Sequence, residues 1–224
     1  MIDLDPLWLT AKLAFITTVV LLVISIPLAY WLAYTRFRFK AIFETIVSLP
    51  LVLPPSVLGF YLLIAFSPSH AFGNFLNQHF NLRLVFSFPG LVLASVIYSL
   101  PFMVNPILSG LKGLPSSLRE ASYTLGKSRS ETLFRILIPN CWSSMRTAIA
   151  MTFAHTLGEF GVVLMVGGSI PRETRLMSIA IYDEVQAMNY STANWYAGIL
   201  FAVAVTVLMT VYLFNNKSRS ADLF

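Results

Sequence analysis

Two ionisable side chains, His155 and Glu159, lie four residues apart in an otherwise apolar stretch of the sequence. On an α-helix this spacing places both side chains on the same face. A charge in apolar surroundings is costly, so we expect Glu159 to be paired, near water or protonated. Two interpretations fit: a contact from Glu159 to His155 or to the backbone that locks helices together, or an element of a pathway or gate. Gly158 and Gly161 beside Glu159 allow close helix contact or a local break.

The most charged stretch between apolar segments is KGLPSSLREASYTLGKSRSETLFRILIP, residues 112–139. Its pattern predicts two short helices joined at Gly126, where a left-handed residue would end the first helix. Two capping-box signals, which begin at Ser117 and Ser128, predict where the helices start. The second helix is expected to stop at Pro139, because proline lacks the backbone N–H that a helix interior needs.

The first predicted helix of this loop is amphipathic. Small and apolar side chains recur at the helical spacing i, i+3, i+4 and i+7, at Leu118, Ala121, Ser122 and Leu125. A short helix of this kind beside an apolar bundle is suited to dock into a groove of a partner protein. The alternative is that the loop only caps the bundle.

The composition predicts the elements that must position these residues. Of the 224 residues, 57% are hydrophobic and 11% are charged, whereas a soluble domain is charged at roughly a quarter of its positions. A membrane-spanning helix needs about 20 apolar residues, and five runs qualify: Leu13–Thr35, Thr45–Phe66, Leu84–Leu111, Cys141–Met165 and Trp195–Phe214. We therefore expect an all-α integral membrane protein with five transmembrane helices. It would be one domain over residues 1–224, with its core at about 9–214.

Lys and Arg are unevenly distributed between these runs. If five helices alternate in direction, eleven of the fifteen fall on one side, among them Arg36, Lys112 and Arg129. Short loops rich in Lys and Arg stay in the cytoplasm. We therefore expect the N-terminus outside and the C-terminus in the cytoplasm, and interpret the net charge of +5 as a topology signal rather than as a sign of nucleic-acid binding.

Motifs for other functions are missing from the sequence. The phosphate-binding pattern GxxxxGK-S/T is absent, so we expect no ATP-binding site in this chain. The patterns HExxH and GxSxG are absent too, which argues against a membrane-embedded enzyme. His70 and His79 have a poor spacing for a metal site, and we expect no cofactor or metal. An ion-coupled secondary transporter or channel stays open as an alternative, with His155 and Glu159 as its intramembrane candidates.

The loop at residues 112–139 resembles the EAA loop of permease subunits of binding-protein-dependent ABC importers. The similarity rests on these residues and spacings: Glu120-Ala121-Ser122, three residues, Gly126, nine residues, then Ile136-x-Ile138-Pro139. The family pattern has Ala in place of Ser122 and commonly Leu in place of Ile138. The resemblance implies that the loop, including the face with Leu118 and Leu125, forms coupling helices that sit in a cleft of a separate ATPase subunit.

Two further stretches, Leu49–Leu63 and Leu157–Asp183, resemble molybdate permeases, and sulfate and thiosulfate permeases are similar to them. The resemblance implies a type-1 importer permease of the cytoplasmic (inner) membrane that carries molybdate or tungstate, with sulfate or thiosulfate as the alternative cargo. It also implies the partners. These are a second copy of the chain, two cytoplasmic ATPase subunits that use ATP and Mg, and a periplasmic oxyanion-binding protein.

The predicted spans contain few groups that could bind such an oxyanion tightly. A doubly charged, strongly hydrated anion is held by Arg or Lys, by helix N-termini or by clustered backbone donors. The first, second, third and fifth runs have no Lys or Arg in their interiors. The remaining run, Cys141–Met165, has Arg146 alone, near its cytoplasmic end. We therefore expect a weak, transient cavity in the permease, with affinity and selectivity supplied by the soluble binding protein.

Overall fold

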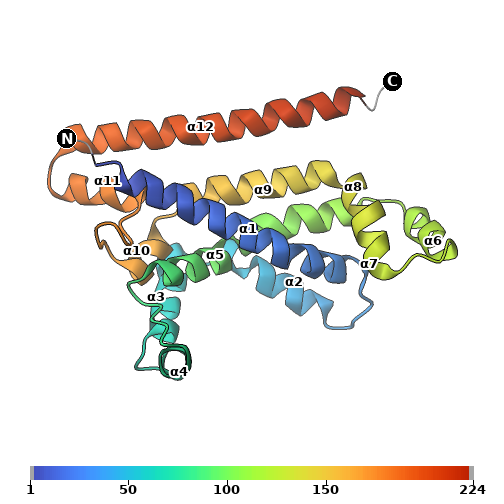
Figure 1. Ribbon diagram of the computed structural model, residues 1–224, viewed down its shortest axis with the longest axis horizontal. Helices are drawn as coiled ribbons and strands as arrows, with labels where there is room; N and C mark the ends of the chain where they lie inside the picture. The colour runs from blue at the N-terminus through green and yellow to red at the C-terminus, as the bar shows by residue number, and fades with distance from the viewer. Residues whose placement is uncertain (1–2, 222–224) are drawn as a thin grey trace.

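The computed structural model describes residues 3–221, which form helices and their connecting loops (Figure 1). The outermost residues of the predicted domain, 1–2 and 222–224, lie outside the described residues. The helices, in chain order, are α1 (Asp5–Tyr34), α2 (Lys40–Ser48), η1 (Leu49–Leu51), α3 (Pro55–Phe66), α4 (Ala71–Phe80), α5 (Phe88–Lys112), α6 (Ser116–Thr124), α7 (Arg129–Thr132), η2 (Leu133–Leu137), α8 (Ile138–Asn140), α9 (Trp142–Leu157), α10 (Gly161–Gly167), α11 (Met177–Gln186) and α12 (Tyr190–Ala221).

Three of the five predicted spans are single long helices, namely α1, α5 and α12. The span over Thr45–Phe66 is broken, and the chain bends by 108° between η1 and α3. Pro54 adopts an extended conformation just before α3, and a proline in a helix both removes a donor and clashes with the preceding turn. The fourth span is bent too, by 58° between α9 and α10. The all-α fold with five spans is thus confirmed if each bent pair counts as one span.

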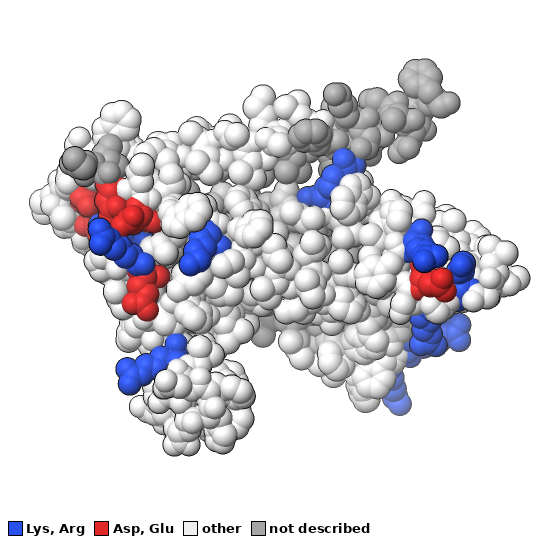
Figure 2. Space-filling view, in the orientation of Figure 1, with Lys and Arg blue, Asp and Glu red and all other residues white. Residues whose placement is uncertain are grey.

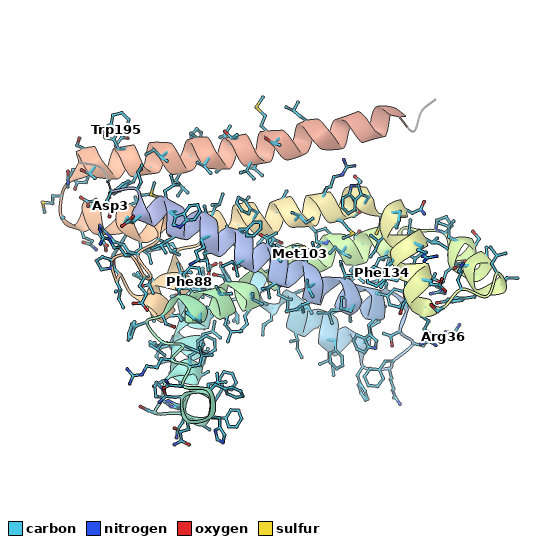
Figure 3. The ribbon with its side chains drawn as sticks, viewed as in Figure 1. Asp3, Arg36, Phe88, Met103, Phe134 and Trp195 are labelled. Carbon is cyan, nitrogen blue, oxygen red and sulfur yellow. The ribbon has the colours of Figure 1, made fainter. Side chains whose placement is uncertain are left out.

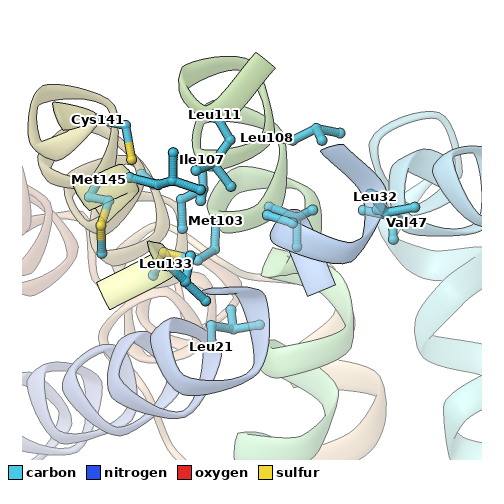
Figure 4. Packing of buried hydrophobic residues seen from close by; sticks show 14 of the residues in the cluster. Leu21, Leu32, Val47, Met103, Ile107, Leu108, Leu111, Leu133, Cys141 and Met145 are labelled. Carbon is cyan, nitrogen blue, oxygen red and sulfur yellow. The ribbon is translucent and has the colours of Figure 1, made fainter. Parts of the chain in front are cut away.

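The core lies where α1, α5 and α9 pack along one another, with α2 and η2 at one end (Figure 4). Leu21, Met103 and Leu137 are fully buried there, and Cys141 and Met145 join the same cluster. Because lipid is as apolar as these side chains, the cluster holds the helices together by close van der Waals packing rather than by escape from water. This gives α1, α5 and α9 fixed relative positions, from which the loops at both ends project.

Most charged side chains on the face shown in Figure 2 gather near its two ends, with mainly uncharged residues between them. One end carries the N-terminus and α11, and the other carries α6 and α7 (Figure 1). A short helix, α4, connects the second and third spans, and its Phe72, Phe75 and Phe80 are exposed. The long helix α12 packs along α9 and α11 but is little buried over Tyr190–Thr210. An apolar band between two polar ends is the distribution of charge that a bilayer requires.

Candidate functional site

The first helix of the 112–139 loop starts differently from the prediction. The capping box at Ser117 is wrong: α6 begins at Ser116, directly after Pro115, without any side-chain cap. Pro115 has an extended conformation, which its ring favours, and it therefore sets the start of the helix. Ser117 is already inside the first turn, where its hydroxyl cannot accept from the N–H groups that a cap satisfies.

The predicted left-handed end of this helix is confirmed at Gly126, whose φ is +75°. The Lys127 N–H donates to the Ser122 carbonyl at 3.1 Å, and the Gly126 N–H donates to the Tyr123 carbonyl at 3.0 Å. These two bonds form a Schellman motif, which satisfies the last carbonyls of the helix. A Cβ at Gly126 would meet no atom within 4 Å, so glycine is needed there for its backbone conformation and not for space.

The second capping box is confirmed. The Glu131 N–H donates to Ser128 Oγ at 3.2 Å, and the Ser128 N–H donates to Glu131 Oε2 at 3.2 Å. The hydrogen bond from the Ser128 backbone and the nearby Lys127 ammonium lower the pKa of Glu131 below its ordinary value. The carboxylate thus stays ionised at neutral pH at the start of α7, where the positive end of the helix dipole favours it.

The helical path then continues through η2, a π-helical segment, and ends at Asn140, one residue past the predicted stop. Pro139 has no N–H to donate to the carbonyl four residues before it. The π-helical segment ends at Leu137, two residues before this proline, and such segments are frequent at functional sites. Leu133 and Leu137 of this segment are buried in the main cluster, while Ile136 is half-buried and Pro139 exposed. The segment η2 therefore anchors the loop to the bundle.

The predicted single face of α6 is divided in the structure. Ser122 is buried, and its hydroxyl lies 2.8 Å from that of Thr132 in α7. By contrast, Leu125 is 79% exposed, and Ala121 and Glu120 are exposed as well. The prediction that Ser122 shares the free face is wrong, because its hydroxyl finds a partner across the turn. Leu118 is half-buried, and the free surface of α6 is the one that carries Ala121 and Leu125.

Two long-range contacts that the sequence did not predict hold α6 against α1. The Arg119 guanidinium lies over the Tyr34 ring, 4.4 Å from its centroid. The Tyr34 hydroxyl in turn donates to the Leu111 carbonyl at 2.9 Å, and the Tyr30 and Tyr123 hydroxyls lie 3.2 Å apart. Only the recurrence of Tyr at positions 30 and 34, one helical turn apart, could have indicated a contact surface on α1. These contacts make α6 a helix of fixed position at one end of the bundle.

The second candidate site surrounds the bend between α9 and α10. The predicted contact between His155 and Glu159 is wrong, because α9 ends at Leu157 and Glu159 lies beyond the break. His155 Nδ1 instead lies 2.9 Å from Ser99 Oγ. The His155 ring stacks on Phe102 with centroids 3.9 Å apart. His155 thus binds α9 to α5, as a structural side chain between packed helices.

Glu159 is buried, with 3% of its surface exposed. Among the described residues neither of its carboxylate oxygens has a hydrogen-bond partner. The Ser95 hydroxyl lies close to the carboxyl without the geometry of a hydrogen bond. The backbone carbonyl of Glu159 accepts from Ser178 Oγ at 2.6 Å, which fixes the break against α11. Of the predicted options, pairing with a charged side chain is not realised in the described part of the chain.

The two bent spans touch at their breaks. A Cβ at Gly161, the first residue of α10, would lie 2.8 Å from Pro55 Cβ at the start of α3. One at Gly59 would lie 2.9 Å from Met165 Cβ. The expectation that Gly158 and Gly161 allow a break and a close contact is confirmed, since Gly158 ends α9 and Gly161 meets Pro55. We call this contact, with Glu159 beside it, the break crossing.

Sequence reasoning missed Ser95, Ser99 and Ser178 at this site. Ser95 and Ser99 are four apart in a run without charges, so they share a helix face. This was an available signal for polar contacts between spans. Pro55 and Gly161 are more than 100 positions apart, and neither local spacing nor composition indicates that they meet. Within residues 3–221 no group of three His, Cys, Asp or Glu side chains is placed to hold a metal ion.

A third polar region lies at the opposite end from the 112–139 loop, around α11. Arg175 forms ion pairs with Asp183 at 3.1 Å and Glu184 at 3.4 Å. Arg172 pairs with Asp5 at 3.0 Å, and Thr10 Oγ1 accepts from the Met177 backbone N–H at 2.8 Å. These contacts join α11 and the loop before it to α1 at this end of the bundle.

Comparison with known proteins gives a consistent result. Residues 25–218 match the family described as "Binding-protein-dependent transport system inner membrane component". The molybdenum transport system permease protein ModB of Azotobacter vinelandii is 46% identical over 94% of this chain and 93% of its own length. ModB of Escherichia coli K12 is 33% identical over 83% of each chain. The sulfate transport system permease protein CysT of Salmonella typhimurium is 28% identical over 93% of this chain and 75% of its own length.

Solved structures show the same fold. A chain of a bacterial ABC transporter involved in the import of alginate superposes with a TM-score of 0.79, over 96% of this chain and 79% of the other. A chain of the inward-facing MetNI methionine ABC transporter superposes with a TM-score of 0.74, over 95% of this chain and 94% of the other. Sequence identities of 15% and 16% restrict this similarity to the arrangement of helices.

Proposed function

Because the chain belongs to the family of binding-protein-dependent transport system inner membrane components, we propose that it is the permease subunit of an ATP-driven molybdate importer. The observation that carries this proposal is the 46% identity to a molybdenum permease over nearly the whole of both chains. The sulfate permease is more distant, at 28% identity, so sulfate or thiosulfate is the second candidate cargo. Tungstate has the geometry and charge of molybdate and would be carried as well.

Movement of the ATPase subunits would reach the bundle through α6. This chain would bind no nucleotide, and ATP and Mg would be used by two cytoplasmic ATPase subunits. The exposed surface with Ala121 and Leu125 is suited to a groove in such a subunit, since a short helix docks by its apolar side. The contacts of Arg119 with Tyr34 and of Ser122 with Thr132 would transmit a displacement of α6 to the bundle. Closure of the ATPases on ATP would thereby draw two copies of the loop together.

Two copies of the chain would enclose the pathway, with a periplasmic oxyanion-binding protein docked at the end that carries α11. Rigid-body rotation of packed helices is a common way to alternate access between two sides. The break crossing would serve as the gate. It brings two helix breaks together at Gly161 and Pro55, and a break leaves backbone groups and a bend that a straight helix lacks.

Specificity would reside in the external binding protein. Glu159 lies beside the crossing, and no Lys or Arg lies in α3 or α10, so this region offers an oxyanion no cation. An anion held tightly inside could not leave. Equilibrium dialysis of the purified permease dimer should therefore show no saturable submicromolar binding of molybdate, tungstate or sulfate. Such binding would refute the proposed weak cavity.

The cargo is tested by reconstituting the chain with its native ATPase and binding protein and measuring which oxyanion stimulates ATP hydrolysis. We expect molybdate and tungstate to stimulate hydrolysis and sulfate not to. Stimulation by sulfate alone would assign the chain to the second candidate function. No stimulation by any oxyanion, together with failure to copurify an ATPase, would refute the importer proposal altogether.

The orientation proposed is N-terminus outside and C-terminus in the cytoplasm. Its test uses single cysteines in a Cys141→Ser background, because Cys141 is the one cysteine of the sequence. Cysteines at the exposed positions Asn74 and Asn189 should react with an impermeant thiol reagent in intact cells. A cysteine at Ser128 should react only after permeabilisation, and labelling of it in intact cells would reverse the orientation.

A further inference from the structure

A cavity of about 560 Å³ lies between the end of α1 and the loop helices α6 and α7. Its lining has a strong positive excess: three arginines, Arg36, Arg119 and Arg129, face a single carboxylate, Glu120. Among the described side chains none of these arginines forms a salt bridge. Within residues 3–221 the cationic charge of the cavity is therefore not neutralised by ion pairs.

The remaining lining of the cavity is aromatic and hydroxylated. It consists of Tyr30, Trp31, Tyr34, Thr35 and Tyr123. Arginine recognises phosphate by paired N–H donors. The Thr35 hydroxyl can add a donor, as can whichever of the paired Tyr30 and Tyr123 hydroxyls accepts from the other, whereas the Tyr34 hydroxyl already donates to Leu111. Aromatic side chains at the end of a spanning helix mark the boundary between lipid and water, and Trp31 is 38% exposed. The chemistry of the cavity thus suits a phosphate group at a membrane surface.

A second cavity, an apolar groove of about 490 Å³, adjoins the first and shares Tyr30 and Arg129 with it. Its walls are the apolar side chains Val23, Ile26, Pro27, Leu133 and Phe134, with Ser130. Along α1 the groove residues precede those of the cationic cavity. The groove thus lies deeper in the bilayer and the cationic cavity nearer its surface. Arg36 and Phe134 are seen at the same end of the molecule in Figure 3.

We propose that the two cavities together bind one anionic phospholipid, with its phosphate headgroup among the three arginines and an acyl chain along the groove. A charged cavity alone would equally suit a free phosphate or oxyanion, but a free anion gives no reason for an apolar groove that continues from it. Basic pockets between membrane helices are known to bind anionic headgroups. The inference does not depend on the cargo of the transporter.

The site touches α6 at three residues, since Arg119, Glu120 and Tyr123 all belong to this helix. The same Arg119 lies over Tyr34 of α1. A headgroup between Arg36 of the chain after α1 and Arg119 of α6 would hold the loop against the bundle by charge-assisted hydrogen bonds. The bound lipid would therefore fix the position of α6 as well as fill the groove.

The test measures lipid retention by the purified permease dimer, using native mass spectrometry after exposure to phosphatidylglycerol or phosphatidylcholine with identical chains. We expect the anionic lipid to be retained preferentially. The pair Arg36→Gln and Arg119→Gln should weaken its binding about 25-fold, at about fivefold for each cation removed near the membrane surface. The matched control pair, Arg38→Gln and Arg135→Gln, removes two positive charges at the same end without touching either cavity, and should retain the preference.

Two further measurements separate the other possible occupants. Val23→Trp, which fills the groove and leaves every charge in place, should reduce retention of the diacyl lipid if the chain lies there. Equal retention of both lipids by the unaltered protein would overturn the proposal. So would displacement of the lipid by excess inorganic phosphate or molybdate, which would indicate a soluble anion as the ligand. Disulfide cross-linking between two copies through a cysteine at Ser130, in the Cys141→Ser background, would show that a second chain covers the groove.

Discussion

The 112–139 loop and the break crossing both place polar groups beside an apolar bundle, and they do so in opposite ways. In the loop the polar groups are paired locally, by the Schellman bonds at Gly126 and the capping box at Ser128. At the break crossing the contacts join distant parts of the chain, and both oxygens of Glu159 have no hydrogen-bond partner among the described residues. The loop is thus built as a rigid element, and the crossing as a contact between two bends.

This difference indicates how work could be divided in the transporter. A helix that transmits a displacement must keep its shape, and local caps provide that at about 1 kcal/mol each. A gate must change its packing, and helix breaks in contact can separate without loss of the helices on either side. Changes at the crossing should therefore affect stability and transport together. Changes in the loop should affect energy coupling while the bundle stays intact.

The largest effect is expected for Gly161→Ala at the break crossing. The new Cβ would lie 2.8 Å from Pro55 Cβ, which forces the two spans apart, and overpacking of this kind costs about 1–3 kcal/mol. Thermal unfolding in detergent should shift to a lower temperature, and molybdate uptake should fall sharply. The control is Gly198→Ala in α12, where a Cβ meets no atom within 4 Å. Indistinguishable unfolding of the two variants would mean that the breaks do not touch.

For Gly126→Val we expect a smaller effect on stability but a strong effect on the coupling between ATP hydrolysis and transport. A Cβ at this position would meet no atom within 4 Å, so we attribute the cost to the left-handed backbone, at about 1–2 kcal/mol. Insertion into the membrane should be normal, whereas stimulation of the ATPase and uptake should fall. Gly126→Asn provides the control, because asparagine tolerates this conformation. If valine and asparagine behave alike, the Schellman turn has no part in coupling.

Alanine substitutions at Ser128 and Ser117, near the two helix starts of the loop, should differ in their effect on stability. Ser128→Ala removes a cap that is formed and should destabilise the loop by about 1 kcal/mol. Ser117→Ala alters a position where no cap is formed and should leave stability unchanged. Hydrogen exchange of the backbone amides in α6 and α7 measures both effects. Equal protection in the two variants would contradict the assignment of the caps.

The smallest effect concerns the pH dependence of the second cap. The Ser128 backbone and Lys127 lower the pKa of Glu131 from its ordinary value of 4.5. A group whose pKa is lowered by folding stabilises the fold above its unfolded pKa and loses that contribution as pH falls through its folded pKa. Protection of the α7 amides should thus be constant near neutral pH and decline below pH 4.5. Comparison with Glu131→Gln at each pH isolates this contribution, and the same decline in both proteins would exclude Glu131 as its source.

Local signals were sufficient to predict much of the fold. Run length and composition predicted the five spans, and the residue types at Gly126 and Ser128 predicted the turn and the cap. Both failed predictions misplaced the end of a helix. At Ser117 a neighbouring proline decided where the helix starts, and at Glu159 an early helix end removed the spacing on which the contact with His155 depended.

The break crossing could not be predicted, because its contacts join residues far apart in the sequence. Proline at positions 54 and 55 signalled a disturbed helix, but the bend of 108° depends on what packs against it. The contact between Arg119 and Tyr34 likewise joins α6 to α1, and these residues are 85 positions apart. Periodicity and capping rules act over one or two helical turns, and they carry no information about such pairs.

The central claim is that ATP hydrolysis by a docked partner, and not an ion gradient, drives an oxyanion past this bundle. Proteoliposomes that contain the chain and its ATPase, with ATP inside and the binding protein outside, allow uptake of molybdate to be measured directly. We predict accumulation that requires both ATP and the binding protein, persists when ionophores collapse all ion gradients, and is reduced in Gly126→Val. Accumulation that proceeds without ATP and stops when the gradients collapse would contradict the account and favour an ion-coupled transporter.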